Sequence, residues 1–235
     1  KRVYLPKFKE GIKCRFSRKF DGKIKTSTIS RTPTGKYFIS ILVETEDTIP
    51  NKAPIDENKA VGVDLGIKTF ATLSDGTEIQ NHKYLNKALK KLKRLQRSVS
   101  RKKKGSSSRK KAVKLLARQY EKVTNRRQDF LHKTSNYFID HYDTICLETL
   151  SASNMVKNHR LAQAIQDIGI YTFNSYMDYK AEWYGKNIIR IGRFEPSSKM
   201  CSCGYVYRGL KLSDRMWTCP ACGSVNQRDL LRSEE

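Results

Sequence analysis

Three carboxylates stand in sequence contexts that favour metal-dependent hydrolysis. Asp64 interrupts the apolar run 60–66, Glu148 ends a second apolar run, and Asp229 falls in the first turn of a predicted helix. An ionised carboxylate in a buried strand is costly unless it is paired or binds a cation. Mg²⁺ and Mn²⁺ prefer such oxygen ligands, and two ions can activate water and stabilise the leaving oxygen of a phosphodiester. Taken singly, the three residues could instead be a turn residue, an exposed strand end and a helix-dipole partner.

Four of the six cysteines fall within 22 residues and predict a metal site. The segment Cys219-Pro-Ala-Cys222-Gly223 is typical of a zinc knuckle, whereas Cys201 and Cys203 have one residue between them instead of two. Disulfide frameworks belong to secreted chains, and residues 1–20 lack the apolar region of an export signal. We therefore predict structural Zn²⁺, with a redox-active or vestigial pair as the alternative. The predicted ligands are Cys201, Cys203, Cys219 and Cys222.

Basic residues dominate one segment of the chain. The 235 residues carry a net charge of +24, and +18 of it lies in residues 83–128, which hold nineteen Lys or Arg and one acid, Glu121. Phosphates can neutralise this self-repulsion, so we predict contact with a nucleic-acid backbone, while a solvated face is the alternative. Aromatic residues are few here, which argues against base stacking. No stretch approaches the roughly 20 apolar residues of a membrane span. The predicted contacts are Lys90, Lys91, Lys93, Arg94, Arg97, Arg101, Lys102, Lys103, Lys104, Arg109, Lys110, Lys111, Arg126 and Arg127.

Hydrophobic periodicity and turn residues divide the chain into elements that could position these groups. Residues 1–50 are rich in predicted strands and resemble a β-barrel fragment, and residues 51–59 form a linker. The Ser74-Asp-Gly-Thr77 segment predicts a type I′ hairpin turn. Cys14 and Cys146 fall in strands and are expected to be buried. The remaining elements are strands at 60–66, 69–73, 78–80, 143–148 and 187–191, a helical hairpin at 83–142, a helix at 160–185, a zinc ribbon at 199–223 and a final helix within 224–235.

The order of these elements predicts an α/β fold. Three strands joined by hairpins and followed by alternating helices and strands match a ribonuclease H-like (RuvC) mixed sheet, here spanning residues 60–198 with the basic hairpin inserted. In such a sheet the first and fourth strands are neighbours, and the last helix packs beside them. The three carboxylates would then converge at one end of the sheet.

Several segments resemble the TnpB family, the OrfB-type proteins of bacterial insertion sequences. Val61-Gly-Val-Asp64-Leu-Gly-Ile-Lys-Thr-Phe70 is similar to the family's first RuvC motif, Leu147-Glu148-Thr-Leu150 to the second and Arg228-Asp229-Leu230 to the third. Segments 125–133 and 196–201 also look like family segments. The resemblance covers nearly the whole chain, in the family's order.

This resemblance implies an RNA-guided DNA endonuclease. A guide noncoding RNA would read a double-stranded DNA target by base pairing, while the protein reads a short flanking motif and backbone shape. Asp64, Glu148 and Asp229 would hold catalytic Mg²⁺ or Mn²⁺, and the cysteine ribbon would hold Zn²⁺. The expected location is the prokaryotic cytoplasm, at the nucleoid. Two alternatives stay open: a nuclease-deficient nucleic-acid-binding regulator or decayed fragment, and a transposase that performs strand transfer.

The chain also departs from the family pattern. It begins inside the expected wedge barrel, and only six residues follow Asp229, so we expect it to be truncated at both ends. The third motif lacks the His that usually precedes the Arg-Asp pair, and the first cysteine knuckle is one residue short.

Overall fold

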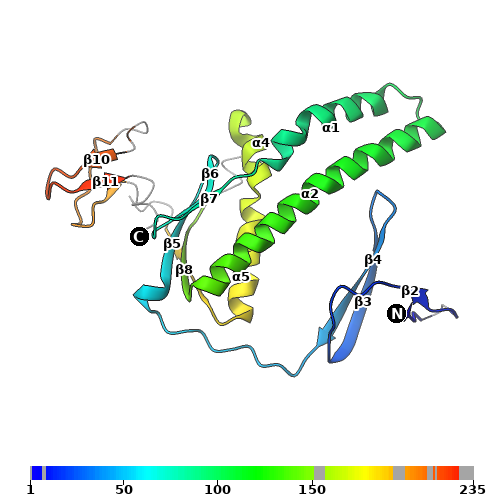
Figure 1. Cartoon of the computed structure of the whole chain (residues 1–235), viewed down its shortest axis with the longest axis horizontal. Coiled ribbons are helices and arrows are strands. Elements are labelled where there is room, and N and C mark those ends of the chain that lie inside the picture. The colour runs from blue at the N-terminus through cyan, green and yellow to red at the C-terminus, as the bar shows by residue number, and fades with distance from the viewer. Residues whose placement is uncertain are drawn as a thin grey trace. The chain divides into compact units, whose positions relative to one another are not determined.

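The computed structural model describes residues 2–6, 9–150, 157–192, 199–210, 214 and 216–227. The chain forms two compact units, Lys1–Thr48 and Ile49–Glu235. Figure 1 shows the elements of each unit. Within the described residues no helix is long and apolar enough to cross a membrane.

The first unit consists of two antiparallel strand pairs. Strand β1 (Arg2–Val3) pairs with β2 (Ile12–Lys13), and β3 (Lys23–Arg31) pairs with β4 (Tyr37–Glu44). The β3–β4 hairpin reverses the chain through residues 32–36, where Gly35 has a φ of 88°. Cys14 is half-buried here, not buried as expected.

The second unit contains a five-stranded mixed sheet in the order β7-β6-β5-β8-β9. Its strands are β5 (Ala60–Leu65), β6 (Thr69–Leu73), β7 (Glu78–Gln80), β8 (Thr144–Glu148) and β9 (Asn187–Ile191). The hairpin-linked strands β5, β6 and β7 run antiparallel, while β5, β8 and β9 run parallel. The predicted mixed sheet, with its first and fourth strands as neighbours, is therefore present.

The turn between β6 and β7 differs from the predicted type I′ geometry. Only Gly76 has a positive φ (85°), whereas a type I′ turn needs positive φ at both central residues. The Gly76 N–H donates to the Leu73 carbonyl (3.0 Å), and the Leu73 N–H donates to the Thr77 carbonyl (2.9 Å). The Asp75 carboxylate accepts the Thr77 N–H (2.8 Å). This side-chain contact favours a type I turn followed by a left-handed glycine.

Helices α1 (Tyr84–Ser100) and α2 (Ser107–His141) form the predicted helical hairpin. The predicted single helix at 160–185 is instead two helices, α4 (His159–Ile168) and α5 (Ile170–Trp183). They are separated at Gly169, which has a φ of 72° and so interrupts the helical backbone.

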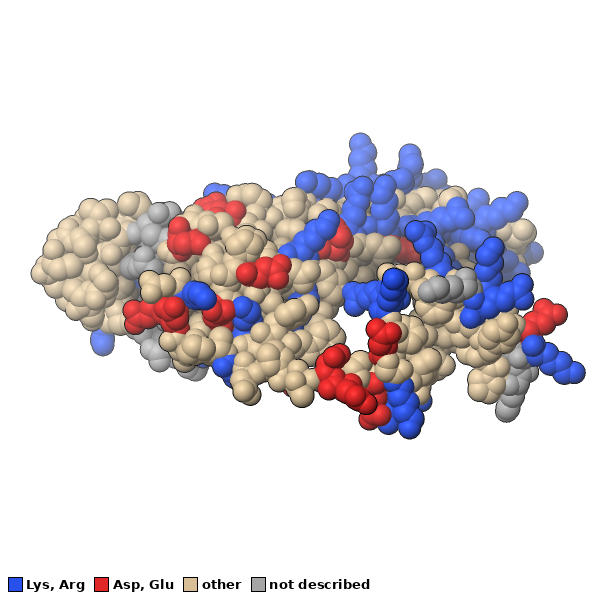
Figure 2. Space-filling model, turned by 60° about the horizontal axis from the view of Figure 1, so that its bottom comes forward, with Lys and Arg blue, Asp and Glu red and all other residues tan. Residues whose placement is uncertain are grey.

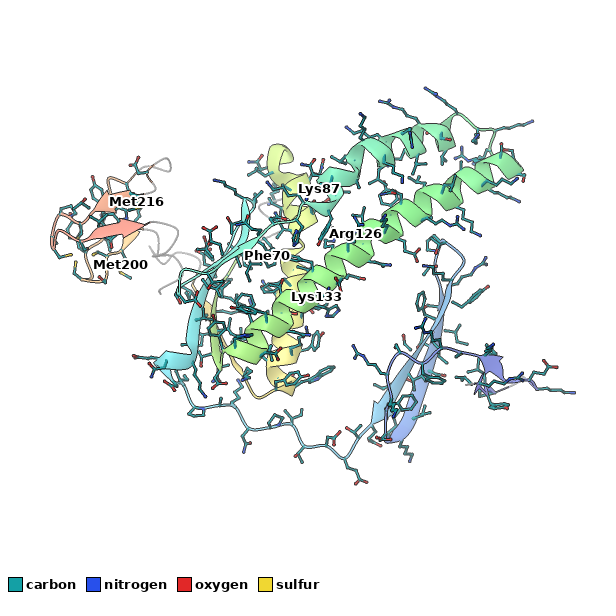
Figure 3. All side chains as sticks on the ribbon, in the orientation of Figure 1. Phe70, Lys87, Arg126, Lys133, Met200 and Met216 are labelled. Atoms are coloured by element: carbon teal, nitrogen blue, oxygen red, sulfur yellow. The ribbon has the colours of Figure 1, made fainter. Side chains whose placement is uncertain are left out.

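The core lies between the sheet and helices α2 and α5. Val63, Leu147 and their neighbours on β5, β6 and β8 pack against apolar side chains of both helices. Phe70 is fully buried there and meets Phe130 and Phe173 edge-on, at ring-centroid distances of 4.9 and 5.2 Å. Figure 3 shows Phe70 between the strands and the helices. Burial of one such side chain contributes about 1.5–3 kcal/mol.

The segment predicted as a linker is partly fixed to the sheet. A 3-10 turn spans Glu57–Lys59. Upstream of it, the Ala53 N–H donates to the Gly185 carbonyl (2.7 Å), and the Asn187 side chain donates to the Ala53 carbonyl (2.8 Å). A Cβ at Gly185 would lie 2.5 Å from the Asn51 carbonyl oxygen, so glycine permits this close approach.

The cysteine-rich segment ends in a strand pair. Strand β10 (Met216–Thr218) pairs antiparallel with β11 (Val225–Gln227). Residues 225–227 of the final helix predicted within 224–235 are therefore a strand, because the turn at Gly223 returns the chain to pair with β10 and this pairing overrides local propensity. The rest of the predicted final helix, with Asp229, lies outside the described residues.

Candidate functional site

Asp64 and Glu148 lie at the same edge and on the same face of the sheet. The parallel strands β5 and β8 are in register at Val63 and Leu147, so the two acids occupy the next level. Neighbouring strands are about 4.8 Å apart, and residues at one level point to one face. Val63 and Leu147 face the core, so both acids face away from it. The structure thus brings together two of the three predicted carboxylates, and the third lies outside the described residues.

The two acids differ in their exposure. Asp64 is 9% exposed, whereas Glu148 is half-buried at the end of its strand. Cys146 lies two residues before Glu148 on the same face of the sheet and is half-buried, not buried as expected. Burial raises the pKa of its thiol. Two adjacent carboxylates in this setting fit a hard divalent cation, which takes oxygen ligands and keeps several waters.

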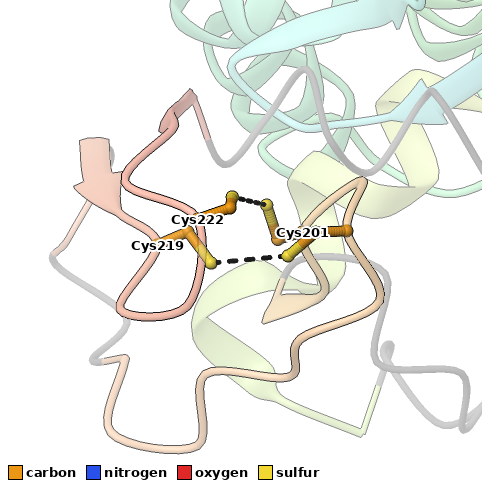
Figure 4. A group of neighbouring side chains, drawn as sticks. Cys201, Cys219 and Cys222 are labelled. Carbon is orange, nitrogen blue, oxygen red and sulfur yellow. Dashed lines mark hydrogen bonds between the residues drawn. The ribbon is translucent and has the colours of Figure 1, made fainter.

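The four clustered cysteines converge from two hairpins. All four Sγ atoms lie within 4.8 Å of one another. The Cys201–Cys222 and Cys203–Cys219 sulfur distances are 3.6 and 3.7 Å, and Figure 4 shows this convergence. A disulfide needs about 2.05 Å. Four sulfurs around one zinc at about 2.3 Å would be separated by about 3.8 Å. The residues therefore fit a tetrahedral metal ion.

The two cysteine turns have different lengths. In the second turn the Gly223 N–H donates to the Cys219 carbonyl (2.9 Å), four residues back. In the first the Gly204 N–H donates to the Cys201 carbonyl (2.8 Å), three residues back. Both glycines have a positive φ, 74° and 84°. The one-residue spacing of Cys201 and Cys203 therefore forms a tighter turn, which still places both sulfurs in the cluster.

Hydrogen-bond donors around the sulfurs favour thiolates at two positions. The Cys203 backbone N–H and then the Ser224 hydroxyl lower the pKa of Cys201 to about 5. The Ser224 hydroxyl is the main cause that lowers the pKa of Cys222. The Tyr205 N–H lowers the pKa of Cys203, but the neighbouring thiols, that of Cys222 first, and burial outweigh it and raise that pKa to about 12. Four thiolates therefore need a cation to coexist.

The basic hairpin presents most of its predicted contacts to solvent. Eleven of the fourteen are exposed, and Lys102, Arg109 and Arg127 are half-buried. Figure 2 shows Lys and Arg side chains crowded together on the surface, and Figure 3 shows Lys87 and Arg126 extending from the two helices. A surface of this kind suits a polyanion.

Two of the predicted contacts have internal partners that the charge pattern could not reveal. Arg109 donates through Nη1 to the carbonyls of Val99 (2.9 Å) and Lys102 (3.2 Å), where α1 ends. Arg127 donates to the Gln166 carbonyl on α4 (3.1 Å). Both side chains thus contribute to fixing the hairpin.

Asp167 is a residue that sequence reasoning missed. This residue of α4 is 8% exposed, and its carboxylate accepts the N–H groups of Leu85 (3.0 Å) and Asn86 (3.3 Å), at the start of α1. Helix α1 has no side-chain cap of its own, because Lys83 occupies that position at a φ of 48°. In the sequence this role is signalled by Asp167 itself, an acid that interrupts the apolar helical pattern of residues 161–173.

Residues 40–159 match the family model OrfB_IS605, described as "Probable transposase", and residues 171–233 match the Cas12f1-like TNB domain. A "Putative RNA-guided DNA endonuclease" of Streptomyces pristinaespiralis is 42% identical over 96% of this chain and 56% of its own length. The "Putative RNA-guided DNA endonuclease InsQ" of Escherichia coli is 31% identical over 93% of this chain and 57% of its own. This chain thus spans a little over half the length of these relatives.

A solved structure shares the fold at low sequence identity. The cryo-EM structure of a CRISPR-Cas12f ternary complex matches with a TM-score of 0.51 and 16% identity, over 86% of this chain and 43% of that chain.

Proposed function

The chain belongs to the OrfB_IS605 family, and on this premise we propose that it carries the nuclease core of a TnpB-like RNA-guided DNA endonuclease. The strand order β7-β6-β5-β8-β9, with its antiparallel and parallel halves, supports a ribonuclease H-like (RuvC) sheet. The single observation that carries the proposal is the register of β5 and β8, which sets Asp64 beside Glu148.

Asp64 and Glu148, with Asp229, would hold Mg²⁺ or Mn²⁺. Bound there, the ions would supply Lewis acidity to a water nucleophile and to the leaving oxygen of a DNA phosphodiester. The residues of this chain orient the site: strand pairing fixes the spacing of the two carboxylates, and the packed core behind Val63 and Leu147 fixes the sheet edge. Cys201, Cys203, Cys219 and Cys222 would hold one structural Zn²⁺, since four protein ligands leave no open position.

The basic hairpin would bind the phosphate backbones of the guide noncoding RNA and of the double-stranded DNA target. Its exposed cations reach phosphates without reading bases, while base pairing between guide and target supplies sequence specificity. With these partners the protein would act in the prokaryotic cytoplasm, at the nucleoid.

The test is cleavage by the purified chain together with its bound RNA. We expect guide-like RNA to co-purify, and Mg²⁺-dependent cleavage of a matching DNA to fall about 100-fold or more in Asp64→Asn, because the lost charge is worth several kcal/mol. The control is Asp129→Asn, an equal charge change at an exposed residue paired with Lys133. Equal cleavage by Asp64→Asn and the control would refute the site.

Two other outcomes would identify different functions. The exposed cations would equally serve a nucleic-acid-binding regulator. Such a regulator would bind DNA or RNA, and no variant would cleave. The description of the matching family model favours a transposase, which would give joined strand-transfer products in place of cleaved ends.

A further inference from the structure

The sulfur of Cys201 lies in a buried, mainly apolar environment that disfavours a thiolate. The residue is 2% exposed and packs with Leu210, Trp217 and Cys219 in a small core of its own. A buried thiolate is stable only where hydrogen-bond donors or a cation surround it. The groups that face Cys201 therefore decide whether this sulfur can act as a ligand.

Two side chains from beyond the second turn reach across to this sulfur. The Ser224 Oγ lies 3.1 Å from Cys201 Sγ and 3.1 Å from Cys222 Sγ, one sulfur from each cysteine pair. The Asn226 Nδ2 lies 3.6 Å from Cys201 Sγ. Both side chains thus approach the same ligand from the opposite hairpin.

Strand pairing holds Asn226 in this position. Asn226 is 8% exposed and lies on β11 opposite Trp217 of β10. Its Nδ2 also lies 3.2 Å from the Ser224 carbonyl and 3.3 Å from the Ser224 Oγ. The amide therefore orients the serine as well as approaching the sulfur.

We propose that Ser224 and Asn226 are positioning residues of the cysteine site, donating hydrogen bonds to the Cys201 thiolate and holding the shortened first cysteine pair against a Zn²⁺ shared with the second. The inference rests on the proposed Zn²⁺ site and extends it. The tighter turn at Cys201 supplies the Cys203 backbone N–H and, at 3.9 Å, the Ser202 hydroxyl, whereas the second hairpin contributes the closer Ser224 and Asn226 side chains. The hydroxyl proton of Ser224 serves one sulfur at a time, so it couples the two cysteine pairs.

The test compares Ser224→Ala with Ser202→Ala in the purified full chain. Ser202 is the matched control, because it is an exposed serine of the same site whose Oγ lies 3.9 Å from Cys201 Sγ. Zn²⁺ affinity is measured by competition with a chromogenic chelator, and the thiolate-to-metal absorption band is recorded with Co²⁺. We expect Ser224→Ala to weaken Zn²⁺ binding about 10- to 100-fold and to shift the band. Ser224→Thr retains a hydroxyl and should restore both.

Asn226→Asp provides a second arm, since it keeps the shape and replaces the amide donor with a carboxylate that repels thiolates. We expect it to weaken Zn²⁺ binding at least as much as Ser224→Ala. Affinities and Co²⁺ bands equal to those of Ser202→Ala in both variants would overturn the inference while leaving the zinc site intact. A wild-type chain that binds no Zn²⁺ would overturn both this inference and the proposed Zn²⁺ site. Cleavage is not a readout, so failure of the proposed nuclease would leave these results unaffected.

Discussion

Asp64, Asp75 and Asp167 have the same side chain and three different kinds of partner. The Asp167 carboxylate accepts backbone N–H groups at a helix start, and the Asp75 carboxylate accepts the hydroxyl of Tyr142 (2.6 Å). Asp64 lies beside a second acid on the outer face of the sheet. Backbone and hydroxyl donors satisfy a carboxylate within the fold, whereas a second carboxylate adds charge that favours a cation. The neighbouring acid therefore marks Asp64 as a candidate metal ligand, whereas the hydrogen bonds of Asp75 and Asp167 are structural.

Tyr142→Phe tests the structural role of Asp75. Burial raises the pKa of Asp75, but hydrogen bonds from Tyr142 and Thr77 outweigh it and hold this pKa below its ordinary value of 3.8. A lowered carboxyl pKa stabilises the fold above the ordinary value, and this stabilisation is lost as pH falls through the folded-state pKa. We expect Tyr142→Phe to lower the free energy of unfolding by about 1 kcal/mol at neutral pH.

Denaturant unfolding near neutral pH and at acid pH checks this expectation. The difference between wild type and Tyr142→Phe should shrink as pH falls below the ordinary value of 3.8, because the protonated Asp75 no longer gains from the hydroxyl. A difference of constant size at both pH values would show that the lost contact is apolar packing and not the bond to the carboxylate.

At the scale of elements, the basic hairpin is held by contacts between its own two helices and by hydrogen bonds to α4. Leu92, Ala112 and Val123 are buried between its helices, and Gln96 donates to the Tyr120 hydroxyl (2.6 Å). At the start of α1, Asp167 supplies the cap that the helix lacks. Because this cap comes from α4, the direction of α1 depends on a residue far away in the sequence.

Asp167→Asn should loosen the start of α1. The amide keeps the shape but loses the charge that interacts with the helix dipole, so we expect a loss of about 1 kcal/mol in unfolding free energy. Hydrogen exchange should become faster at the amides of Leu85 and Asn86, which donate to this carboxylate. Asp129→Asn, at an exposed i,i+4 pair, should change stability by less than about 0.5 kcal/mol. Unchanged exchange at both amides would contradict the capping role.

The elements that could be predicted are those set by local pattern. The strands of the sheet and the helical hairpin follow apolar periodicity, and the neighbours β5 and β8 follow from their order. Other features depend on contacts between distant segments. The strand at Asn226 exists because it pairs with Trp217, and the cap at Leu85 comes from Asp167. The break at Gly169 was visible only as one glycine in an apolar helical pattern, which also fits a continuous helix.

The candidate site likewise has features that could be predicted from the sequence and features that could not. The residue types at Asp64, Glu148 and the four cysteines indicated metal chemistry, and their convergence followed from strand order and turn spacing. The hydrogen bonds of Ser224 to two sulfurs could not be predicted, because they depend on how two hairpins face each other.

For the whole molecule, uneven charge has two consequences. Most of the excess of 47 basic over 23 acidic side chains sits on one helical hairpin, where a bound polyanion would relieve the self-repulsion. The structure also divides these cations by task. Arg97 on α1 and Arg101 just after its last residue are exposed, whereas Arg109 is half-buried and donates to backbone carbonyls. Charge alone therefore does not identify the contacts with nucleic acid.

The salt dependence of binding can separate these tasks. Each phosphate contact releases counterions, so the slope of log affinity against log salt concentration measures the number of contacts. We expect Arg97→Gln with Arg101→Gln to weaken binding of any duplex and to reduce the slope by about two, one for each lost contact.

The control is Arg109→Gln, which removes the same positive charge from an arginine that is bound within the fold. It should lower the unfolding temperature and leave the slope nearly unchanged, since its guanidinium already serves the Val99 and Lys102 carbonyls. Fluorescence anisotropy titrations over a series of salt concentrations give the slopes. If Arg109→Gln reduced the slope as much per residue as the exposed pair, the division of tasks would be wrong and the hairpin would act only through its total charge.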